Sequence, residues 1–281
     1  MRILCLSALF AVLATAAFAQ KDIRIITAGS AMTETVCALG DCDKIVASDK
    51  TSLYPEKIQN LPSIGYRTSI SAEGIISLKP TLVIAEKGYV PDVVLEQLTS
   101  TGVKIVIVER GYDFEATKNV ITTIGAALNR ATEARALCKK IETELAEASA
   151  LVKKSKNTPR VLCIFNRGTS SVDIADTKTF ASILPLVGAT SAVSGIDGYK
   201  PLNAEALIAS NPEYILMFES GVQSLGGIDG VLKIAGVQQT IAGSEKQIIA
   251  YDGIRLSNFG PRLGETAKEL ALLLHPDIQP K

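Results

Sequence analysis

The sequence is poor in histidine: His275, close to the C-terminus, is the only one in 281 residues. Zinc and manganese sites usually need two or more imidazoles, so a histidine-built metal site is not expected. The same scarcity removes most Ser-His and Cys-His catalytic arrangements. No Cys-x-x-Cys motif and no phosphate-binding glycine loop compensates for it. We therefore do not expect an enzyme.

An excess of charge of one sign is also missing, since 29 basic residues are balanced by 29 acidic ones. There is no basic tract and no interleaving of basic and aromatic residues, so we expect no nucleic-acid partner. Beyond the N-terminal segment, no stretch is apolar enough to span a bilayer. The sequence predicts a soluble protein, and we expect a monomer.

The N-terminal segment has the pattern of a secretory signal peptide. Arg2 supplies a positive start, residues 3–17 are almost continuously apolar, and Ala17-Phe18-Ala19 offers the small residues that a signal peptidase reads. The apolar run is short for a membrane span. We predict a signal peptide over residues 1–19, with an N-terminal anchor helix as the alternative.

Four cysteines would remain after cleavage, in the oxidising compartment that export implies. Cys37 and Cys42 flank a predicted helix end, where a chain reversal could bring them together. The sequence leaves the bonded and the free state of this pair open. Cys138 and Cys163 are expected to be small buried hydrophobes rather than a second pair.

Short apolar, β-branched runs alternate with helical stretches along the chain. The predicted strands are Ile23–Ile26, Lys44–Ala47, Thr81–Ala85, Lys104–Val108, Val161–Phe165, Glu213–Phe218 and Gln247–Tyr251. The predicted helices include Thr33–Leu39, Ser71–Leu78, Val90–Ser100 and Asp113–Asn129. Alternation of this kind predicts an α/β protein with parallel sheets covered by helices.

One segment, residues 131–156, contains neither glycine nor proline. Its apolar residues step by three and four, which makes one helical stripe, and the helix would reach roughly 37 Å. We interpret it as a rigid strut between two small α/β lobes, residues 20–130 and 157–281, with the ligand cleft between them. An ordinary long surface helix is the alternative.

An internal repeat supports two lobes, because residues 71–84 align with residues 203–216 without a gap. Each copy has a helix-capping residue, a glutamate two positions later, an apolar face, a proline and a strand. With one gap, Gly65-Tyr66-Arg67 also matches Gly198-Tyr199-Lys200. The repeat should place an aromatic residue and a cation at the same edge of each lobe.

Several motifs together carry a resemblance to a known family. The N-terminal half contains Asp49-x-Thr51-Ser52-x-Tyr54-Pro55, Leu61-Pro62-x-Ile64-Gly65-Tyr66 and Ala72-Glu73-Gly74-Ile75. The C-terminal half contains Gly198-Tyr199-Lys200-Pro201-Leu202-x-Ala204-Glu205-Ala206-Leu207, Gly226-Gly227-Ile228-Asp229-Gly230 and Phe259-Gly260-Pro261-Arg262. With these motifs the sequence resembles, over essentially its whole mature length, the periplasmic haem-binding proteins of bacterial haem ABC importers.

The resemblance implies two small lobes joined by one long helix, and a location in the periplasm. It implies that ferric haem binds in the inter-lobe cleft and is delivered to an inner-membrane ABC importer, with an outer-membrane haem receptor system as a further candidate partner. The Ala-Glu-Gly-Ile motif followed by Pro-x-Leu-Val-Ile is shared with siderophore and cobalamin binders. Cobalamin or a ferric siderophore is therefore the alternative cargo.

The resemblance also implies that Tyr66 binds the haem iron. Ferric iron is a hard ion and phenolate is a hard oxygen donor. Free tyrosine has a pKa of about 10, and both the ferric ion and a nearby cation such as Arg67 favour loss of the proton. Arg67 could instead bind a haem propionate or face away, and Tyr66 could stack on the ligand without touching the metal.

Some relatives add a histidine ligand after the first strand of the C-terminal lobe, where this chain has Asn166-Arg167-Gly168-Thr169-Ser170. We therefore expect five-coordinate iron, or a weak sixth ligand such as water. Arg167 could pair with a propionate or be a solvated loop residue. Tyr199 could stack on the porphyrin and Lys200 could reach a propionate, or both could be structural. Tyr89 follows a strand, but its direction is not set by the sequence.

Glu73 and Glu205 occupy equivalent positions of the repeat. In the family, paired glutamates of this kind dock onto arginines of the two permease subunits, so the resemblance implies that role here. The helix dipole also favours a carboxylate in the first turn of a helix, which is the alternative explanation.

Overall fold

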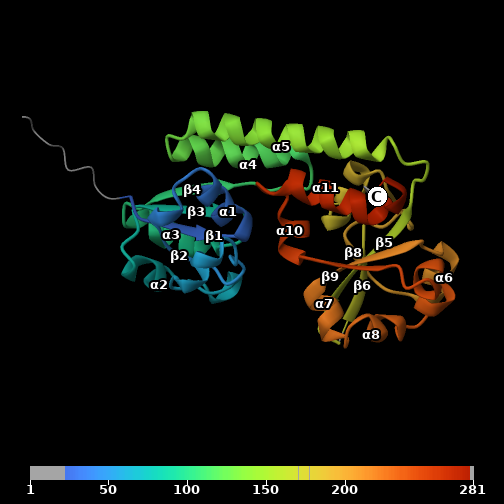
Figure 1. Cartoon of the computed structure of the whole chain (residues 1–281). Helices are drawn as coiled ribbons and strands as arrows, with labels where there is room; N and C mark the ends of the chain where they lie inside the picture. The colour runs from blue at the N-terminus through green and yellow to red at the C-terminus, as the bar shows by residue number, and fades with distance from the viewer. Residues whose placement is uncertain (1–22, 170, 177, 279–281) are drawn as a thin grey trace, which may run out of the picture.

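The computed structural model describes residues 23–169, 171–176 and 178–278. Figure 1 shows two α/β lobes side by side, with the helix α5 running across both of them. Helix α5 spans Ala131–Val152, so it begins at the predicted residue and ends four residues before the predicted end. Its 22 residues extend over roughly 33 Å. The predicted signal peptide lies outside the described residues.

The N-terminal lobe is built on a four-stranded parallel sheet with the strand order β2-β1-β3-β4. The central strands β1 and β3 are almost entirely buried, as expected when helices cover both faces of a sheet. The strands are β1 Ile25–Ala28, β2 Ile45–Ser48, β3 Leu82–Glu86 and β4 Lys104–Val108, and the α-helices are α1 Ser30–Ala38, α2 Ala72–Ser77, α3 Asp92–Ser100 and α4 Phe114–Ala127; the 3-10 helices are η1 Cys42–Lys44, η2 Glu56–Asn60 and η3 Arg67–Ser69.

The C-terminal lobe has a six-stranded sheet with the order β10-β9-β5-β6-β8, and β7 pairs with β5. Its strands are β5 Arg160–Arg167, β6 Ser171–Ala175, β7 Thr190–Ser191, β8 Tyr199–Pro201, β9 Tyr214–Phe218 and β10 Ile248–Tyr251. Its helices are α6 Ala204–Ser210, α7 Glu219–Ser224, α8 Ile228–Leu232, α9 Ile241–Ser244, α10 Gly253–Asn258 and α11 Leu263–Leu274, with the 3-10 helices η4 Phe180–Val187, η5 Val237–Gln239 and η6 Pro276–Ile278.

This second sheet is mixed, whereas the alternation of elements predicted a parallel one. Strand β6 runs antiparallel to both β5 and β8. The three unpredicted strands, β6, β7 and β8, are short and lack the long apolar run by which buried strands are recognised. The predicted loop around Arg167 and the Gly198-Tyr199-Lys200 segment thus lie on or beside strands.

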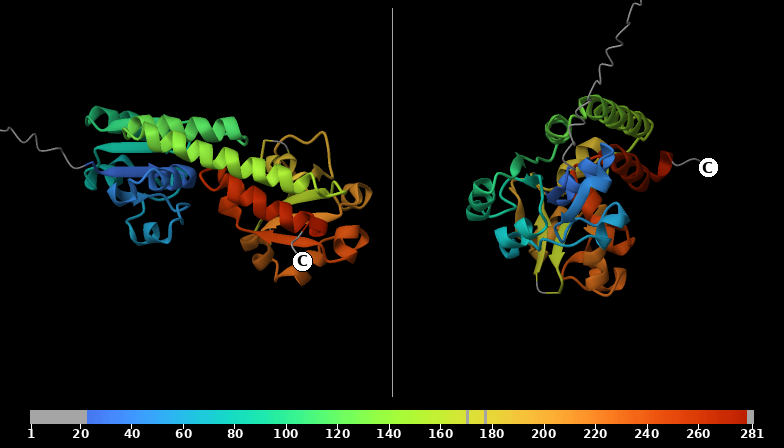
Figure 2. Two further views of the ribbon diagram at one scale, coloured as in Figure 1. Left: turned by 45° about the horizontal axis from the view of Figure 1, so that its top comes forward. Right: turned by 90° about the vertical axis from the view of Figure 1, so that its left-hand side faces the viewer.

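Helix α5 is seated on one helix of each lobe. It packs against α4 of the N-terminal lobe and against α11 of the C-terminal lobe, as Figure 2 shows for α11. Two glycines permit this close approach: a Cβ atom at Gly125 would lie 2.6 Å from Cβ of Ala134, and one at Gly264 would lie 2.4 Å from Cβ of Glu144. Helix α5 therefore contacts both lobes along its length.

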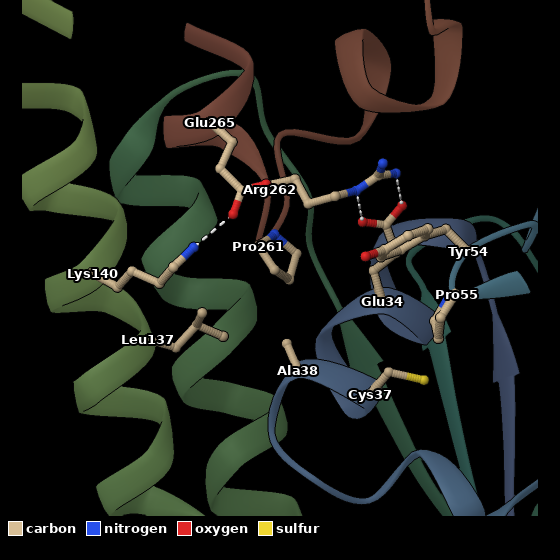
Figure 3. Close-up of a pocket in the computed structure, with 10 residues that line it drawn as sticks. All are labelled: Glu34, Cys37, Ala38, Tyr54, Pro55, Leu137, Lys140, Pro261, Arg262 and Glu265. Atoms are coloured by element: carbon tan, nitrogen blue, oxygen red, sulfur yellow. Dashed lines mark hydrogen bonds and ion pairs between the residues drawn. The ribbon is translucent and has the colours of Figure 1, made fainter. Parts of the chain in front are cut away.

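The end of α10 and the segment that connects it to α11 join the lobes a second time. The backbone oxygens of Ser257 and Phe259 accept hydrogen bonds from Arg110 Nη1 and Thr117 Oγ1 of the N-terminal lobe, each at 2.7 Å. Figure 3 shows Arg262 of the same segment facing Glu34 of α1. Because α5 and this segment both connect the lobes, we expect the angle between the lobes to change only slightly.

The pocket in Figure 3, of about 310 Å³, lies at this joint between α1, α5 and the start of α11. Its charged side chains are paired with one another: Arg262 with Glu34, and Lys140 Nζ with Glu265 Oε1 at 2.8 Å. The pocket thus supplies its own counter-charges, and both ion pairs stabilise the joint between the lobes.

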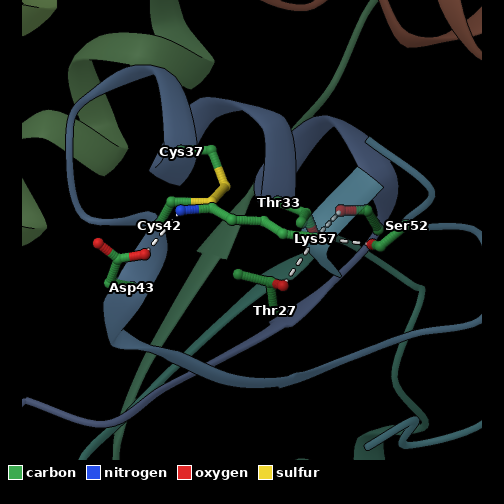
Figure 4. Close-up of a disulfide and its surroundings, with 8 residues drawn as sticks. Thr27, Thr33, Cys37, Cys42, Asp43, Ser52 and Lys57 are labelled. Carbon is green, nitrogen blue, oxygen red and sulfur yellow. Dashed lines mark hydrogen bonds and ion pairs between the residues drawn. A yellow bond between two sulfur atoms is a disulfide. The ribbon is translucent and has the colours of Figure 1, made fainter. Parts of the chain in front are cut away.

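A disulfide joins Cys37, near the end of α1, to Cys42 in η1 (Figure 4). The structure thereby resolves the alternative that the sequence left open. Beside it, the hydroxyl of Thr33 is hydrogen-bonded to those of Thr27 and Ser52, at 2.7 and 2.6 Å. Cys138 is half-buried and Cys163 is buried, and neither is in a disulfide. Among the described helices, none is both long and apolar enough to cross a membrane.

Candidate ligand-binding site

Tyr66 is held at the surface of the N-terminal lobe as the residue that caps the short helix η3. The hydroxyl of Ser69 accepts a hydrogen bond from the Tyr66 amide at 2.8 Å and donates one to its carbonyl at 2.9 Å. Gly65 has φ +99°, and a Cβ atom there would lie 2.7 Å from Ser69 Oγ, so this turn requires glycine. The Tyr66 side chain is 48% exposed and therefore open to a ligand.

Tyr66 and Arg67 lie together around the ring of Tyr89. The Tyr66 and Tyr89 rings meet edge to face with centroids 6.1 Å apart. Arg67 Cζ lies 4.7 Å from the centroid of Tyr89 and 5.7 Å from that of Tyr66, within the range of cation–π attraction. No carboxylate of the described residues lies within ion-pair distance of Arg67. An uncompensated guanidinium thus stands beside the Tyr66 ring.

The ring of Tyr89 is fixed from behind by Asp49, which is 2% exposed. The Tyr89 hydroxyl donates to Asp49 Oδ2 at 2.5 Å, and the amide of Gly29 and the hydroxyl of Ser52 donate to Oδ1 at 2.9 and 2.7 Å. Burial, together with this hydrogen bond to a carboxylate, raises the pKa of Tyr89. Tyr89 is therefore a neutral platform for Arg67, tied to the lobe through its hydroxyl.

The C-terminal lobe contributes a row of aromatic rings. Tyr199, which is 45% exposed, has its ring centroid 5.2 Å from that of Phe165. Phe165 in turn contacts Phe218 at 5.5 Å, and Phe218 contacts the fully buried Phe180 at 4.7 Å. The row anchors an exposed tyrosine to the core and provides an aromatic wall whose rings are tilted against one another.

Lys200 does not share this wall. In β8, Tyr199 pairs with Ala175 and Lys200 pairs with Ile174. Successive side chains of a strand point to opposite faces of the sheet, so Lys200 points away from the aromatic row. Arg167 is the last residue of β5, opposite Ser171, and its side chain lies outside the described part of the structure.

A pocket of about 380 Å³ lies between the lobes. Leu53, 48% exposed, lines it from the N-terminal lobe, and Phe218 lines it from the aromatic row. Two carboxylates, those of Glu219 and Asp252, also line it. Asp252 Oδ2 lies 3.8 Å from Arg262 Nη1, whereas Glu219 is in no ion pair among the described residues, so Glu219 in particular would repel an anionic group of a ligand from this end of the cleft.

Glu73 and Glu205 are both exposed in the first turns of α2 and α6. Each helix begins with a side-chain cap: Ser71 Oγ accepts from the Gly74 amide, and Asn203 Oδ1 accepts from the amides of Glu205 and Ala206. Among the described residues, neither glutamate is in an ion pair. No cluster of three or more metal-ligating side chains is found in the described part of the chain.

The sequence profile of the periplasmic binding protein family matches residues 25–254. The chain therefore belongs to this family and is a substrate-binding component of an ABC transporter rather than an enzyme. The family, the two-lobed α/β fold and the non-enzymatic role agree with the sequence predictions.

Two solved structures are similar to this chain over almost its whole length. The periplasmic heme-binding protein RhuT from Roseiflexus sp. RS-1 is 34% identical with a TM-score of 0.87, covering 92% of this chain and 100% of RhuT. The periplasmic heme-binding protein HutB of Vibrio cholerae is 31% identical with a TM-score of 0.84, covering 91% and 100%.

Two further relatives are similar in sequence. The ABC transporter substrate-binding lipoprotein YvrC of Bacillus subtilis, whose substrate its name leaves open, is 25% identical over 90% of this chain and 80% of YvrC. The vitamin B12-binding protein of Yersinia pestis is 38% identical, but only over 80 residues, which are 28% of this chain and 29% of that protein.

Proposed function

We propose that this protein binds ferric haem in the cleft between its lobes and delivers it to an inner-membrane ABC haem importer. The observation that carries the proposal is the exposed phenol of Tyr66 with the guanidinium of Arg67 beside it, which has no carboxylate partner among the described residues. It is supported by similarity, over almost the whole chain, to proteins whose names state that they bind heme.

In this proposal, Tyr66 binds the iron as phenolate. A ferric ion favours a hard anionic oxygen, and the positive charge of Arg67 stabilises the phenolate form. Because the chain has only one histidine, and His275 is 1% exposed in the C-terminal lobe, no imidazole is at hand as a second ligand. The iron is then five-coordinate or carries a weak sixth ligand such as water.

The porphyrin would lie between Tyr66 and the aromatic row that ends in Tyr199. Its two propionates would avoid the end of the cleft near Glu219 and Asp252 and would point toward cations at the rim. Arg67 and Arg167 are the proposed partners, because a guanidinium binds a carboxylate through two donors. Lys200 is the weaker candidate, since it points away from the row.

Delivery follows from the proposed export and docking. Residues 1–19 would be removed as a signal peptide, leaving in the periplasm a protein with lobes at residues 20–130 and 157–281 and a connecting helix from residue 131. Glu73 and Glu205, one on each lobe, would then bind basic residues of the two permease subunits. Their exposure and their lack of ion-pair partners among the described residues support this role.

A hemin titration tests the proposed ligand. The purified protein should shift the Soret band of hemin and give a tyrosinate-to-iron charge-transfer band. The variant Tyr66→Phe should lose the charge-transfer band. Tyr54→Phe is the matched control, because Tyr54 is also 48% exposed, and should keep it. A Tyr66→Phe spectrum identical to that of the wild type would remove Tyr66 as the iron ligand.

Cobalamin is the second candidate cargo. It is favoured by the local similarity to the vitamin B12-binding protein, and a ferric siderophore would suit the same fold. Neither cargo needs a bond between the protein and iron. Binding of cyanocobalamin, with no response to hemin, would decide for this alternative.

A further inference from the structure

The repeat places more than a glutamate on the surface of each lobe. One turn after Glu73, Ile76 of α2 is 38% exposed; one turn after Glu205, Ile208 of α6 is 41% exposed. Residues three apart on a helix are neighbours on one face, so each lobe presents a carboxylate next to an isoleucine. We call these two the Glu–Ile pairs.

The two pairs are equivalent in their packing as well as in sequence. The residue before each exposed isoleucine, Ile75 in α2 and Leu207 in α6, is fully buried at 0% exposure. The two helices thus have the same rotation about their axes and turn the same face outward. A single exposed isoleucine is ordinary on a protein surface. The presence of a Glu–Ile pair at matching positions of two lobes with different sequences calls for an explanation.

The surface around the first pair is hollowed. Glu73 and Ile76 line an open groove between α2 and α3, together with Gln97, Ser100 and Thr101. The groove is uncharged apart from Glu73, so it offers a partner one electrostatic anchor beside an apolar contact.

We propose that Ile76 and Ile208 complete the proposed glutamate contacts with the permease, and that each permease subunit offers, beside its basic side chain, an apolar pocket that takes one of these isoleucines. This inference rests on the proposed delivery to an ABC importer. A two-fold permease needs one contact from each lobe, and Figure 1 shows α2 and α6 on the outer sides of the two lobes.

The two parts of each pair have different tasks. The glutamate sets the encounter and the orientation, because exposed charges act mainly on association rate and specificity. The isoleucine supplies affinity, because burial of an apolar side chain at the centre of a contact slows dissociation. An anionic membrane surface would repel both glutamates, and so would the equivalent face of a second copy of this chain.

Binding of the full-length mature protein to the haem importer of its own bacterium, reconstituted in nanodiscs, tests the inference by biolayer interferometry. Ile76→Ala and Ile208→Ala should each weaken binding about tenfold, mainly through faster dissociation. Ile107→Ala, on β4, is the matched control at 41% exposure and should bind as the wild type does. Hemin titrations and melting temperatures of all three variants should be unchanged.

Several outcomes would overturn the inference. If the double isoleucine variant docks normally while Glu73→Gln/Glu205→Gln does not, the glutamates dock alone. If neither double variant changes docking, delivery through these helices falls as well. Binding to empty nanodiscs, or a dimer that the isoleucine variants abolish in sedimentation experiments, would assign the surface to lipid or to a second copy. If the wild-type protein does not bind hemin but the variants still lose docking, only the proposed cargo is overturned.

Discussion

Glu34 of α1 and Arg262, at the start of α11, form a two-point ion pair between the lobes. Arg262 Nε lies 2.8 Å from Glu34 Oε2, and Nη2 lies 2.7 Å from Oε1. Asn258 donates to the same carboxylate at 3.0 Å, and the Arg262 guanidinium lies 4.1 Å from the ring centroid of Tyr54. The pair is therefore a buried, hydrogen-bonded joint, and it lies in a motif, Phe259-Gly260-Pro261-Arg262, that the sequence singled out without a role.

Breaking this ion pair should strongly lower the free energy of unfolding. Arg262→Met leaves the Glu34 carboxylate, only 3% exposed, without its charge partner. Removing one member of a buried ion pair typically lowers the free energy of unfolding by about 3–5 kcal/mol. Urea unfolding followed by circular dichroism measures the loss.

Two controls separate this effect from a general loss of charge. Lys178→Met breaks a pair with Asp197 in which both side chains are largely exposed, and should change the free energy of unfolding by less than about 1 kcal/mol. The double variant Glu34→Leu/Arg262→Met removes both buried charges and should recover much of the loss. Equal losses in the Arg262 and Lys178 variants would contradict a special role for the inter-lobe pair.

Tyr89 should have two functions, a hydrogen bond to Asp49 and a ring that supports Arg67, and two substitutions separate them. Tyr89→Phe removes one donor to the buried Asp49 but keeps the ring beneath Arg67. It should lower the free energy of unfolding by about 1–2 kcal/mol and leave the hemin spectrum unchanged. Tyr89→Leu removes the platform as well, so hemin affinity should fall with it. A hemin response that is the same in both variants would show that the ring does not position Arg67.

Much of the architecture followed from the sequence because its signals are local. Strand β4 lies at its predicted residues, and helix α5 starts where predicted, since glycine and proline are absent from one long stripe. The helix α2 and its counterpart α6 also follow from short-range signals, namely a cap, an apolar face and a proline.

The site was only partly accessible because its contacts are long-range. Asp49 and Tyr89 are forty residues apart, and no local pattern shows that one fixes the other. Tyr89 was recognised as following a strand, but its direction depends on tertiary packing. Likewise, the short polar strand β8 hides the fact that Tyr199 and Lys200 face opposite sides.

Asp41 should make stability depend on pH in the acid range. Burial of this carboxyl opposes ionisation, but hydrogen bonds from Arg130 and Lys44 outweigh it and lower the pKa of Asp41. A lowered pKa contributes stability above the unfolded value of about 3.9 and loses it as the pH falls through the folded value. Asp41→Asn should therefore be about 2 kcal/mol less stable at pH 7, and the gap should shrink as the pH falls below about 3.9. Parallel stability curves for the two proteins would contradict this.

The disulfide between Cys37 and Cys42 should stabilise the turn that contains Asp41. Closing so short a loop removes chain entropy from the unfolded state worth about 2 kcal/mol. The variant Cys37→Ser/Cys42→Ser should lose about that amount, and the wild type should lose the same on reduction. Cys138→Ser, which changes a half-buried free thiol, is the control and should respond little.

The same turn should couple the disulfide to the acid response. Asp41 lies inside the loop that the disulfide closes, and its carboxylate meets Arg130 just before α5 begins. Without the cross-link, the turn can move away from Arg130, so the ion pair weakens. Adding Asp41→Asn to the cysteine variant should then cost less than the same change costs in the wild type, because neighbouring contacts are not additive. Strict additivity in a double-mutant cycle at pH 7 would show that the disulfide and the Asp41–Arg130 pair act independently.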